Sequence, residues 1–161
     1  MITCHFENKS KAGLRHVVVG VLIVKNKKVL LTKRGTFKGK PILESGKWAL
    51  PGGFMDRNET LVETAKREVW EETGWKIDKL KLFRIVDNPN RPNDSDRQNV
   101  SFEYIANAVS QVSVKSEEVM ESAWFDLDNL PSKKEVAFDF YDTLVLFKKY
   151  LKKNFPLPVL G

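Results

Sequence analysis

The sequence predicts an α/β protein in which helices pack on a mixed β-sheet. One observation is the segment 16–24, which is rich in β-branched residues and almost continuously apolar, as in a strand that is buried on both faces. The other is a pair of amphipathic helical patterns, at 61–73 and 140–151. Strands, a helix, further strands and a terminal helix, in this order, favour an α/β sandwich.

Length, composition and charge indicate the class of protein and exclude some others. The chain has 161 residues, of which 42% are hydrophobic, so we expect one domain over 1–161. No apolar stretch is long enough to cross a membrane, and 1–15 is polar where a signal peptide would be apolar. The single Cys4 fits a reducing compartment, so we expect a cytoplasmic protein. The net charge of +6 attracts polyanions such as nucleotides, and it does not by itself indicate nucleic acid.

The first half of the chain predicts a hairpin and a glycine turn. After the strand 16–24, a polar turn leads to a second strand at 28–34. Arg34, at the end of that strand, is either a phosphate ligand or a solvated strand end. The turn-rich stretch 35–47 is typical of an exposed loop and is a candidate substrate flap. The stretch 48–53 predicts a short strand that breaks into Gly-Gly, where the backbone can approach a ligand closely.

The central helix is marked at both ends. Thr60 and Glu63 have the spacing of a capping box, in which each side chain bonds to the backbone amide of the other residue. Gly74 supplies a left-handed stop. These signals predict a helix from about Leu61 to Thr73.

One face of this helix is apolar and the adjoining face is acidic. At about 100° per residue, the apolar stripe holds Leu61, Val62, Ala65 and Val69. The acidic stripe holds Glu68, Glu71 and Glu72, whose carboxylates repel one another at these spacings. A bound Mg²⁺ would relieve that repulsion, because it takes oxygen ligands and bridges to substrate phosphates. The alternative is an ordinary solvated helix face.

The region after the helix alternates between strand and loop. The stretch 80–86 predicts a strand, and 87–99 has no apolar side chain except proline, which is typical of a solvated loop. That loop is either a functional lid, with Arg91 and Arg97 reaching phosphates or a ribose, or a plain connection.

The last third predicts two strands and a helix. The strands are expected at 100–108 and 122–125. The helix is indicated by apolar residues at helical spacing, namely Phe140, Leu144, Phe147 and Leu151. We interpret this stripe as core and the lysines beside it as a solvated face.

The spacing around the acidic helix resembles the signature of the Nudix hydrolase family. Seven fixed identities are present without a gap, namely Gly53, Glu59, Arg67, Glu68, Glu71, Glu72 and Gly74. The pattern also places apolar Val69 after Arg67-Glu68, and an apolar residue after Gly74. Trp75 departs mildly, since the family usually has an aliphatic residue there.

This resemblance implies a Nudix-type α/β/α sandwich with a central mixed β-sheet and hydrolysis of a phosphoanhydride bond, with Mg²⁺, or Mn²⁺ in its place. It implies that Glu68 and Glu72 are the principal metal ligands, that Glu71 is a further ligand or base, and that Arg67 with Glu59 orients them. The family also suggests the carbonyl of Gly52 as a metal ligand. Near the strand at 122–125 the family often has another acid, and the candidates are Glu117, Glu118 and Glu121.

The expected substrate is a nucleoside diphosphate linked to another moiety, most simply ADP-ribose, a related dinucleotide or a nucleotide sugar. The reason is that 81–108 loosely resembles ADP-ribose pyrophosphatases of the family. One alternative is a house-cleaning nucleoside triphosphate pyrophosphohydrolase that acts on oxidised guanine nucleotides. Another is a non-catalytic module that binds nucleotide or RNA. The expected partner is a small-molecule nucleotide, with a homodimer as one possible assembly.

Overall fold

The computed structural model describes residues 2–90, 98–114 and 116–161. The strands are β1 Ile2–His5, β2 Lys11–Leu14, β3 His16–Lys25, β4 Lys28–Arg34, β5 Thr36–Phe37, β6 Lys40–Pro41, β7 Trp48–Ala49, β8 Trp75–Val86, β9 Asn99–Gln111, β10 Val119–Asp126 and β11 Val159–Leu160. The helices are α1 Leu61–Thr73, a 3₁₀ turn at Lys133–Glu135 and α2 Phe140–Lys153.

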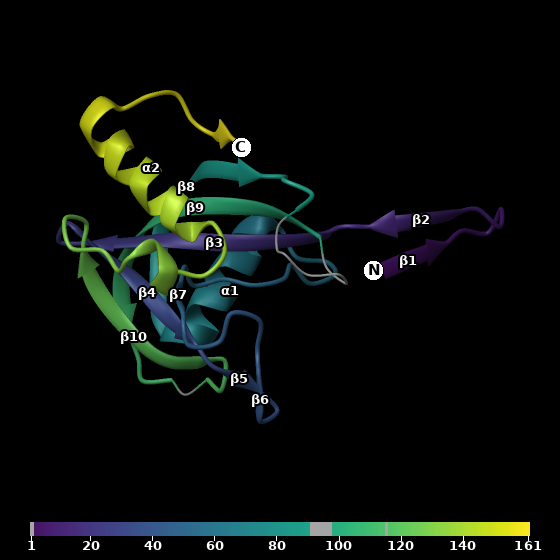
Figure 1. The fold of residues 1–161 in the computed structure, drawn as a ribbon, viewed down its shortest axis with the longest axis horizontal. Coiled ribbons are helices and arrows are strands. Elements are labelled where there is room, and N and C mark those ends of the chain that lie inside the picture. The colour runs from purple at the N-terminus through teal and green to yellow at the C-terminus, as the bar shows by residue number, and fades with distance from the viewer. Residues whose placement is uncertain (1, 91–97, 115) are drawn as a thin grey trace.

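A seven-stranded mixed β-sheet forms the centre of the molecule, in the order β10-β4-β3-β9-β8-β11, with β7 added beside β4. The pairs β3–β9 and β8–β11 are parallel, and the other pairs are antiparallel. Helices α1 and α2 lie on opposite faces of this sheet (Figure 1). The predicted α/β/α sandwich is therefore confirmed. Within the described residues, no helix is both long and apolar enough to span a membrane.

Two hydrophobic clusters, one on each face of the sheet, explain why β3 is apolar at nearly every position. Val21 and Ile23 belong to the cluster beneath α1, while Leu22 belongs to the cluster beneath α2. All three side chains are fully buried. Successive residues of a strand point to opposite faces, so a strand that is covered on both sides carries no polar alternation.

Two residues assigned to apolar stripes are exposed instead. Val62 is 39% exposed and Leu151 is 57% exposed, so the prediction that they pack in the core is wrong. Val62 lies in the first turn of α1, and Leu151 lies in the last turn of α2. Helical spacing predicts the direction in which a side chain points, but it does not predict which turns of the helix are covered by the sheet.

Strands β8, β9 and β10 are longer than predicted, and two hairpins were not predicted, namely β1–β2 and, within the loop 35–47, β5–β6. Strand β8 begins at Trp75, directly after the helix stop, and register shifts between Asp78 and Lys81 and between Leu82 and Arg84 interrupt its pairing with β9. Such bulges break the alternation on which strand prediction depends. Strands β1 and β2 pair only with each other in the described residues, and they project from the body (Figure 1).

Candidate active site

The acidic helix has the predicted bounds because both of its caps form. The Thr60 hydroxyl accepts from the Glu63 amide at 3.3 Å, and the Glu63 carboxylate accepts from the Thr60 amide at 2.8 Å. Gly74 adopts the left-handed conformation, with φ 69°, and ends the helix. The helix thereby fixes the positions of the glutamates along its length.

Arg67 connects the carboxylates of the motif. Its Nε and Nη2 donate to the two carboxylate oxygens of Glu59 at 2.7 and 3.0 Å. Its Nη1 donates to Glu68 at 2.9 Å and to Glu71 at 3.2 Å, and Nη2 also donates to the carbonyl of Phe54 at 3.1 Å. The bonds from Arg67 lower the pKa of Glu59 to about 2 and raise the pKa of Arg67 itself. One guanidinium therefore orients three acids and the loop before the helix.

Glu68 and Glu72 lie deeper than Glu71. Burial raises the pKa of Glu68, although the ion pair with Arg67 opposes the change. Burial, and then the neighbouring Glu68 carboxylate, raise the pKa of Glu72 to about 8. The amide of Gly52 donates to Glu72 at 3.2 Å. Glu71, in contrast, has a side chain that is 57% exposed. Negative charge is therefore least compensated at Glu72, whereas Arg67 offsets part of the charge of Glu68.

The Gly-Gly turn is packed directly against this pair. Gly52 has φ 149°, and a Cβ there would overlap the carbonyl oxygen of Val19. A Cβ on Gly53 would lie 2.6 Å from a carboxylate oxygen of Glu68. The carbonyl of Gly53 accepts from the Val19 amide at 2.9 Å, which ties the turn to β3. The backbone therefore requires glycine at position 52, and at position 53 glycine leaves room for the Glu68 carboxylate.

A cavity of about 290 Å³ opens beside these groups. It is lined by Val18, Val19, Arg34, Leu43, Leu50, Gly52, Gly53, Phe54, Asp56, Arg67, Glu68, Glu71, Glu72, Asn99, Glu118, Phe138 and Phe140. The α1 glutamates form an acidic part of the lining, which also contains aromatic rings and the Arg34 guanidinium. Such a cavity suits a ligand with both a charged and a planar part.

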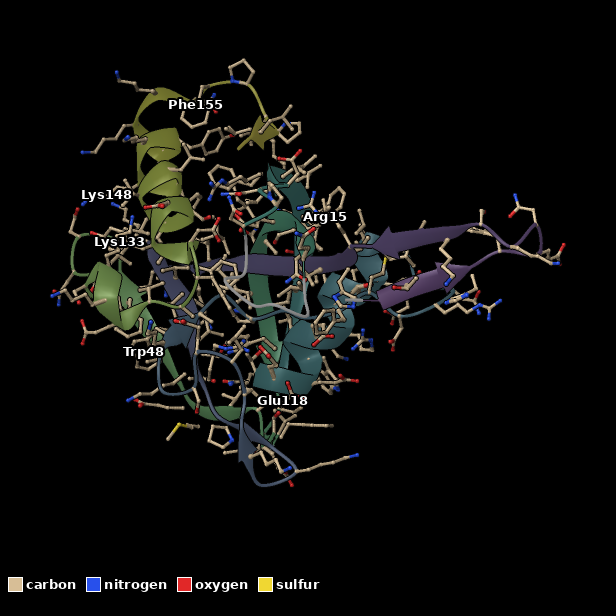
Figure 2. All side chains as sticks on the ribbon, turned by 45° about the vertical axis from the view of Figure 1, so that its right-hand side comes forward. Arg15, Trp48, Glu118, Lys133, Lys148 and Phe155 are labelled. Carbon is tan, nitrogen blue, oxygen red and sulfur yellow. The ribbon has the colours of Figure 1, made fainter. Side chains whose placement is uncertain are left out.

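Of the three additional acids, only Glu118 lies in this cavity. The Gly35 amide donates to the Glu118 carbonyl at 2.8 Å, so pairing of the chain near β4 places Glu118 there. Its charge contributes to the raised pKa values of Glu68 and Glu72, and Figure 2 labels it below α1. Glu117 accepts from the Lys38 amide at 3.1 Å, and Glu121 lines a second cavity, which Glu72 also lines.

A further part of the lining comes from two segments that are distant in sequence. Arg34 Nε donates to the carbonyl of Leu43 at 2.7 Å, and the guanidinium carbon lies 5.1 Å from the ring centroid of Phe138. The loop 35–47 therefore contributes to the site through Leu43. Phe54 and Phe138 also line the cavity, and they were not predicted as site residues because they carry no periodic or motif signal. Phe140, predicted only as a core residue, lines the cavity as well.

The second predicted loop is only partly described. Arg91 and Arg97 lie outside the described residues. At the loop ends, Arg15 Nη2 donates to the carbonyls of Asp87 and Asn99 at 2.6 Å each, and Asn99 lines the cavity.

The acidic wall fits a hard divalent cation. Its donors are oxygens, and the pKa of Glu72, raised by burial first and then by Glu68, means that a charged carboxylate there is costly unless a cation offsets it. Within the described residues, no three His, Cys, Asp or Glu side chains are grouped to hold a metal ion as they stand. A cation here would therefore complete its coordination with waters and substrate oxygens, as Mg²⁺ usually does.

The comparisons with known proteins agree with this geometry. Residues 14–144 match the NUDIX domain family. An ADP-ribose pyrophosphatase of Methanocaldococcus jannaschii is 37% identical over 124 residues, which are 76% of this chain and 67% of that protein. An 8-oxo-dGTP diphosphatase of Buchnera aphidicola is 39% identical over 71 residues, which are 44% of this chain and 51% of that protein.

A solved structure of a MutT Nudix hydrolase from Burkholderia pseudomallei has a TM-score of 0.69 and 28% identity, and the match covers 83% of this chain and 98% of that one. The family match spans most of the chain, and the acids and the arginine of the family signature are gathered at one cavity. The chain belongs to the Nudix family of hydrolases.

Proposed function

We propose that this enzyme hydrolyses the phosphoanhydride bond of a nucleoside diphosphate linked to another moiety, with ADP-ribose as the first candidate. The observation that carries the proposal is the extent of the similarity to the Methanocaldococcus jannaschii protein named ADP-ribose pyrophosphatase, which spans 76% of this chain. The cavity supports it, because acids, an arginine and aromatic rings surround one space. In the reaction, water attacks one phosphorus, the bridging P–O bond breaks, and AMP and ribose 5-phosphate leave.

Each acid then has a role in the proposal. Glu68 and Glu72, with the carbonyl of Gly52, would hold Mg²⁺ or Mn²⁺. When bound, such an ion offsets charge on the diphosphate and activates water. Glu71 would serve as a further ligand or a base. Arg67, fixed by Glu59, keeps the Glu68 carboxylate turned toward the cavity.

Two groups outside the motif complete the proposed site. Glu118 is the acid of the later loop that faces the same cavity, so it is a second candidate to accept the proton of the attacking water. Arg34 brings positive charge to the same cavity and would contact the diphosphate oxygens.

Product analysis tests the substrate. Purified protein with Mg²⁺ is incubated with ADP-ribose, dinucleotides, nucleotide sugars and nucleoside triphosphates, and the products are separated by ion-exchange chromatography. AMP with ribose 5-phosphate supports the proposal. Absence of turnover of all diphosphate-linked substrates would refute it.

The second candidate is a triphosphate pyrophosphohydrolase that acts on oxidised guanine nucleotides. It is favoured by the similarity to the Buchnera aphidicola protein named 8-oxo-dGTP diphosphatase, although that similarity covers only 44% of this chain. Release of pyrophosphate from 8-oxo-dGTP, faster than cleavage of ADP-ribose, would select this function.

We also propose that the enzyme is cytoplasmic, that residues 1–161 form one domain, and that it assembles as a homodimer. The lone Cys4 supports a reducing compartment. The hairpin β1–β2 supports self-association, because an isolated two-stranded sheet is only marginally stable and this one has exposed edges. Light scattering coupled to size exclusion distinguishes a dimer from a monomer.

A further inference from the structure

The backbone of Phe138 has a conformation that aromatic residues rarely adopt. Its φ is +54°, in the left-handed region. The segment before it is buried at Val136 and Ala137, and the Ala137 amide donates to the carbonyl of Trp48 at 2.7 Å. Helix α2 begins at Phe140, which is also buried. The chain therefore reverses at Phe138 between two anchored segments, a place where glycine would be unstrained.

The ring of Phe138 has a defined partner at this position. The guanidinium carbon of Arg34 lies 5.1 Å from its centroid, within the range of a cation–π contact. The ring also makes an edge contact with Phe140, at 5.7 Å and 85°. On the other side, Arg34 Nε donates to the Leu43 carbonyl at 2.7 Å. The guanidinium is thus held by a backbone carbonyl and an aromatic ring.

This arrangement lies at the cavity that the acidic helix also lines. Arg34 and Phe138 line the same cavity as Glu68 and Glu72. A planar guanidinium recognises phosphate oxygens through directed hydrogen bonds, so its orientation matters more than that of a lysine ammonium. A long side chain held in advance loses less conformational freedom when the ligand binds.

We propose that Phe138 is a positioning residue, whose left-handed backbone presents its ring so that the Arg34 guanidinium is held toward the diphosphate of the substrate. The inference rests on the proposed function, because it assigns Arg34 to the substrate phosphates. Backbone strain that is retained at a ligand site often serves such pre-organisation.

A double-mutant cycle tests whether Phe138 acts through Arg34. The variants are Phe138→Leu, Arg34→Ala and the two combined, assayed with Mg²⁺ on the nucleotide that the wild type cleaves fastest. Phe138→Leu should lower kcat/KM about tenfold in the wild-type background and less than about twofold in the Arg34→Ala background, as for residues that act in contact. Equal losses in both backgrounds would show that the ring acts by itself or only through folding, and overturn the proposal.

Two further variants separate positioning from packing. Phe138→Tyr keeps the ring and should retain kcat/KM within about twofold. Phe138→Gly removes the ring, suits the left-handed backbone and should lose activity as the leucine variant does. Full activity in the glycine variant would also overturn the proposal. This variant keeps the test valid if the leucine variant does not fold, as judged by its melting temperature.

The matched control is Phe155→Leu. Phe155 is likewise partly buried, and its ring centroid lies 5.4 Å from that of Tyr150. Neither residue lines the cavity, and Figure 2 shows Phe155 at the opposite end of the molecule from Glu118, which does. The kcat/KM of this variant should be unchanged.

If the wild type cleaves no nucleotide, the proposed function fails, and the cycle is then measured on the Kd for inorganic pyrophosphate by calorimetry. The same non-additive pattern supports the positioning role of Phe138, whereas additive effects or no binding by the wild type overturn it.

Discussion

Replacing Glu72 by glutamine should stabilise the metal-free protein while removing its activity. Glutamine is nearly isosteric, and its side-chain oxygen can still accept from the Gly52 amide, which bonds to Glu72 at 3.2 Å. The variant removes only the charge. Because the pKa of Glu72 is raised to about 8, by burial first and then by Glu68, that charge is costly in the folded state.

The magnitude follows from the two pKa values. The pKa of Glu72 rises from 4.5 to about 8, and each unit is worth about 1.4 kcal/mol, so a fully charged, fully buried carboxylate would cost about 5 kcal/mol. Solvent screening at this partly exposed side chain reduces the expected gain of the glutamine variant to about 2–3 kcal/mol. For a chain of this length, that is roughly 5–10 °C in Tm.

The free energy of unfolding must depend on pH with a definite sign, because the pKa of Glu72 is higher in the folded state than in the unfolded state. Between pH 4.5 and about 8 the folded state holds a proton at Glu72 that the unfolded state has released, so the free energy of unfolding of the wild type falls as pH rises. The variant lacks this fall. The two proteins should therefore be equally stable near pH 4.5 and differ most at pH 8 and above.

Thermal unfolding in chelator from pH 5 to 9 measures the difference, and repetition with Mg²⁺ should raise the Tm of the wild type more than that of the variant. Glu71→Gln is the control for stability, because its exposed carboxylate, with a side chain 57% exposed, should change the free energy of unfolding by less than about 0.5 kcal/mol. Turnover is followed on the best nucleotide substrate. A variant that is no more stable than the wild type at pH 8, or that turns over at a near-normal rate, would refute the reasoning.

Three other substitutions test the residues that position the glutamates of the site. Gly53→Ala places a Cβ 2.6 Å from a carboxylate oxygen of Glu68, so that side chain must turn away; kcat should fall at least about tenfold while circular dichroism stays native. An active alanine variant would contradict this. Thr60→Ala removes the cap of α1 and should lower the free energy of unfolding by about 1 kcal/mol in urea titrations, and an unchanged midpoint would contradict it. Arg67→Lys loses the paired bonds to Glu59, whose pKa is held at about 2, so the part of the stability difference from wild type that comes from these bonds should be complete above pH 4.5 and disappear as pH falls toward 2. The lost bond to the Phe54 carbonyl does not depend on pH. A stability difference that does not shrink between pH 4.5 and 2 would contradict the assignment.

Local signals in the sequence were sufficient for the acidic helix. Thr60, Glu63 and Gly74 act within a few residues of one another, and the structure begins and ends the helix where they indicate. The grouping of Arg67 with Glu59 could also be expected, but only because the family spacing indicated it. Seven residues of sequence lie between these two, and their contact depends on the turn that precedes the helix.

The remaining walls of the site could not be predicted, because they depend on pairing between distant segments. Glu118 could not be chosen over its neighbours until the bond from the Gly35 amide placed its backbone beside the end of β4. Phe138 lines the cavity because its own backbone is left-handed and reverses the chain between a buried segment and α2. Neither a period nor a motif encodes such a reversal, and tertiary contacts alone fix it.

Positive charge is distributed unequally among the three glutamates of the helix. Arg67 bonds to Glu68 and Glu71 and so offsets the charge of both, whereas Glu72 accepts from the Gly52 amide and is affected by Arg34 only as a more distant charge. A cation that enters beside Glu68 and Glu72 therefore gains most from Glu72, which is the least compensated of the three. The arginine sets the direction of the carboxylates without cancelling the charge that would hold the metal. A second arginine beside Glu72 would lower its pKa and make the fold more stable, but it would also remove the reason for a cation to bind there.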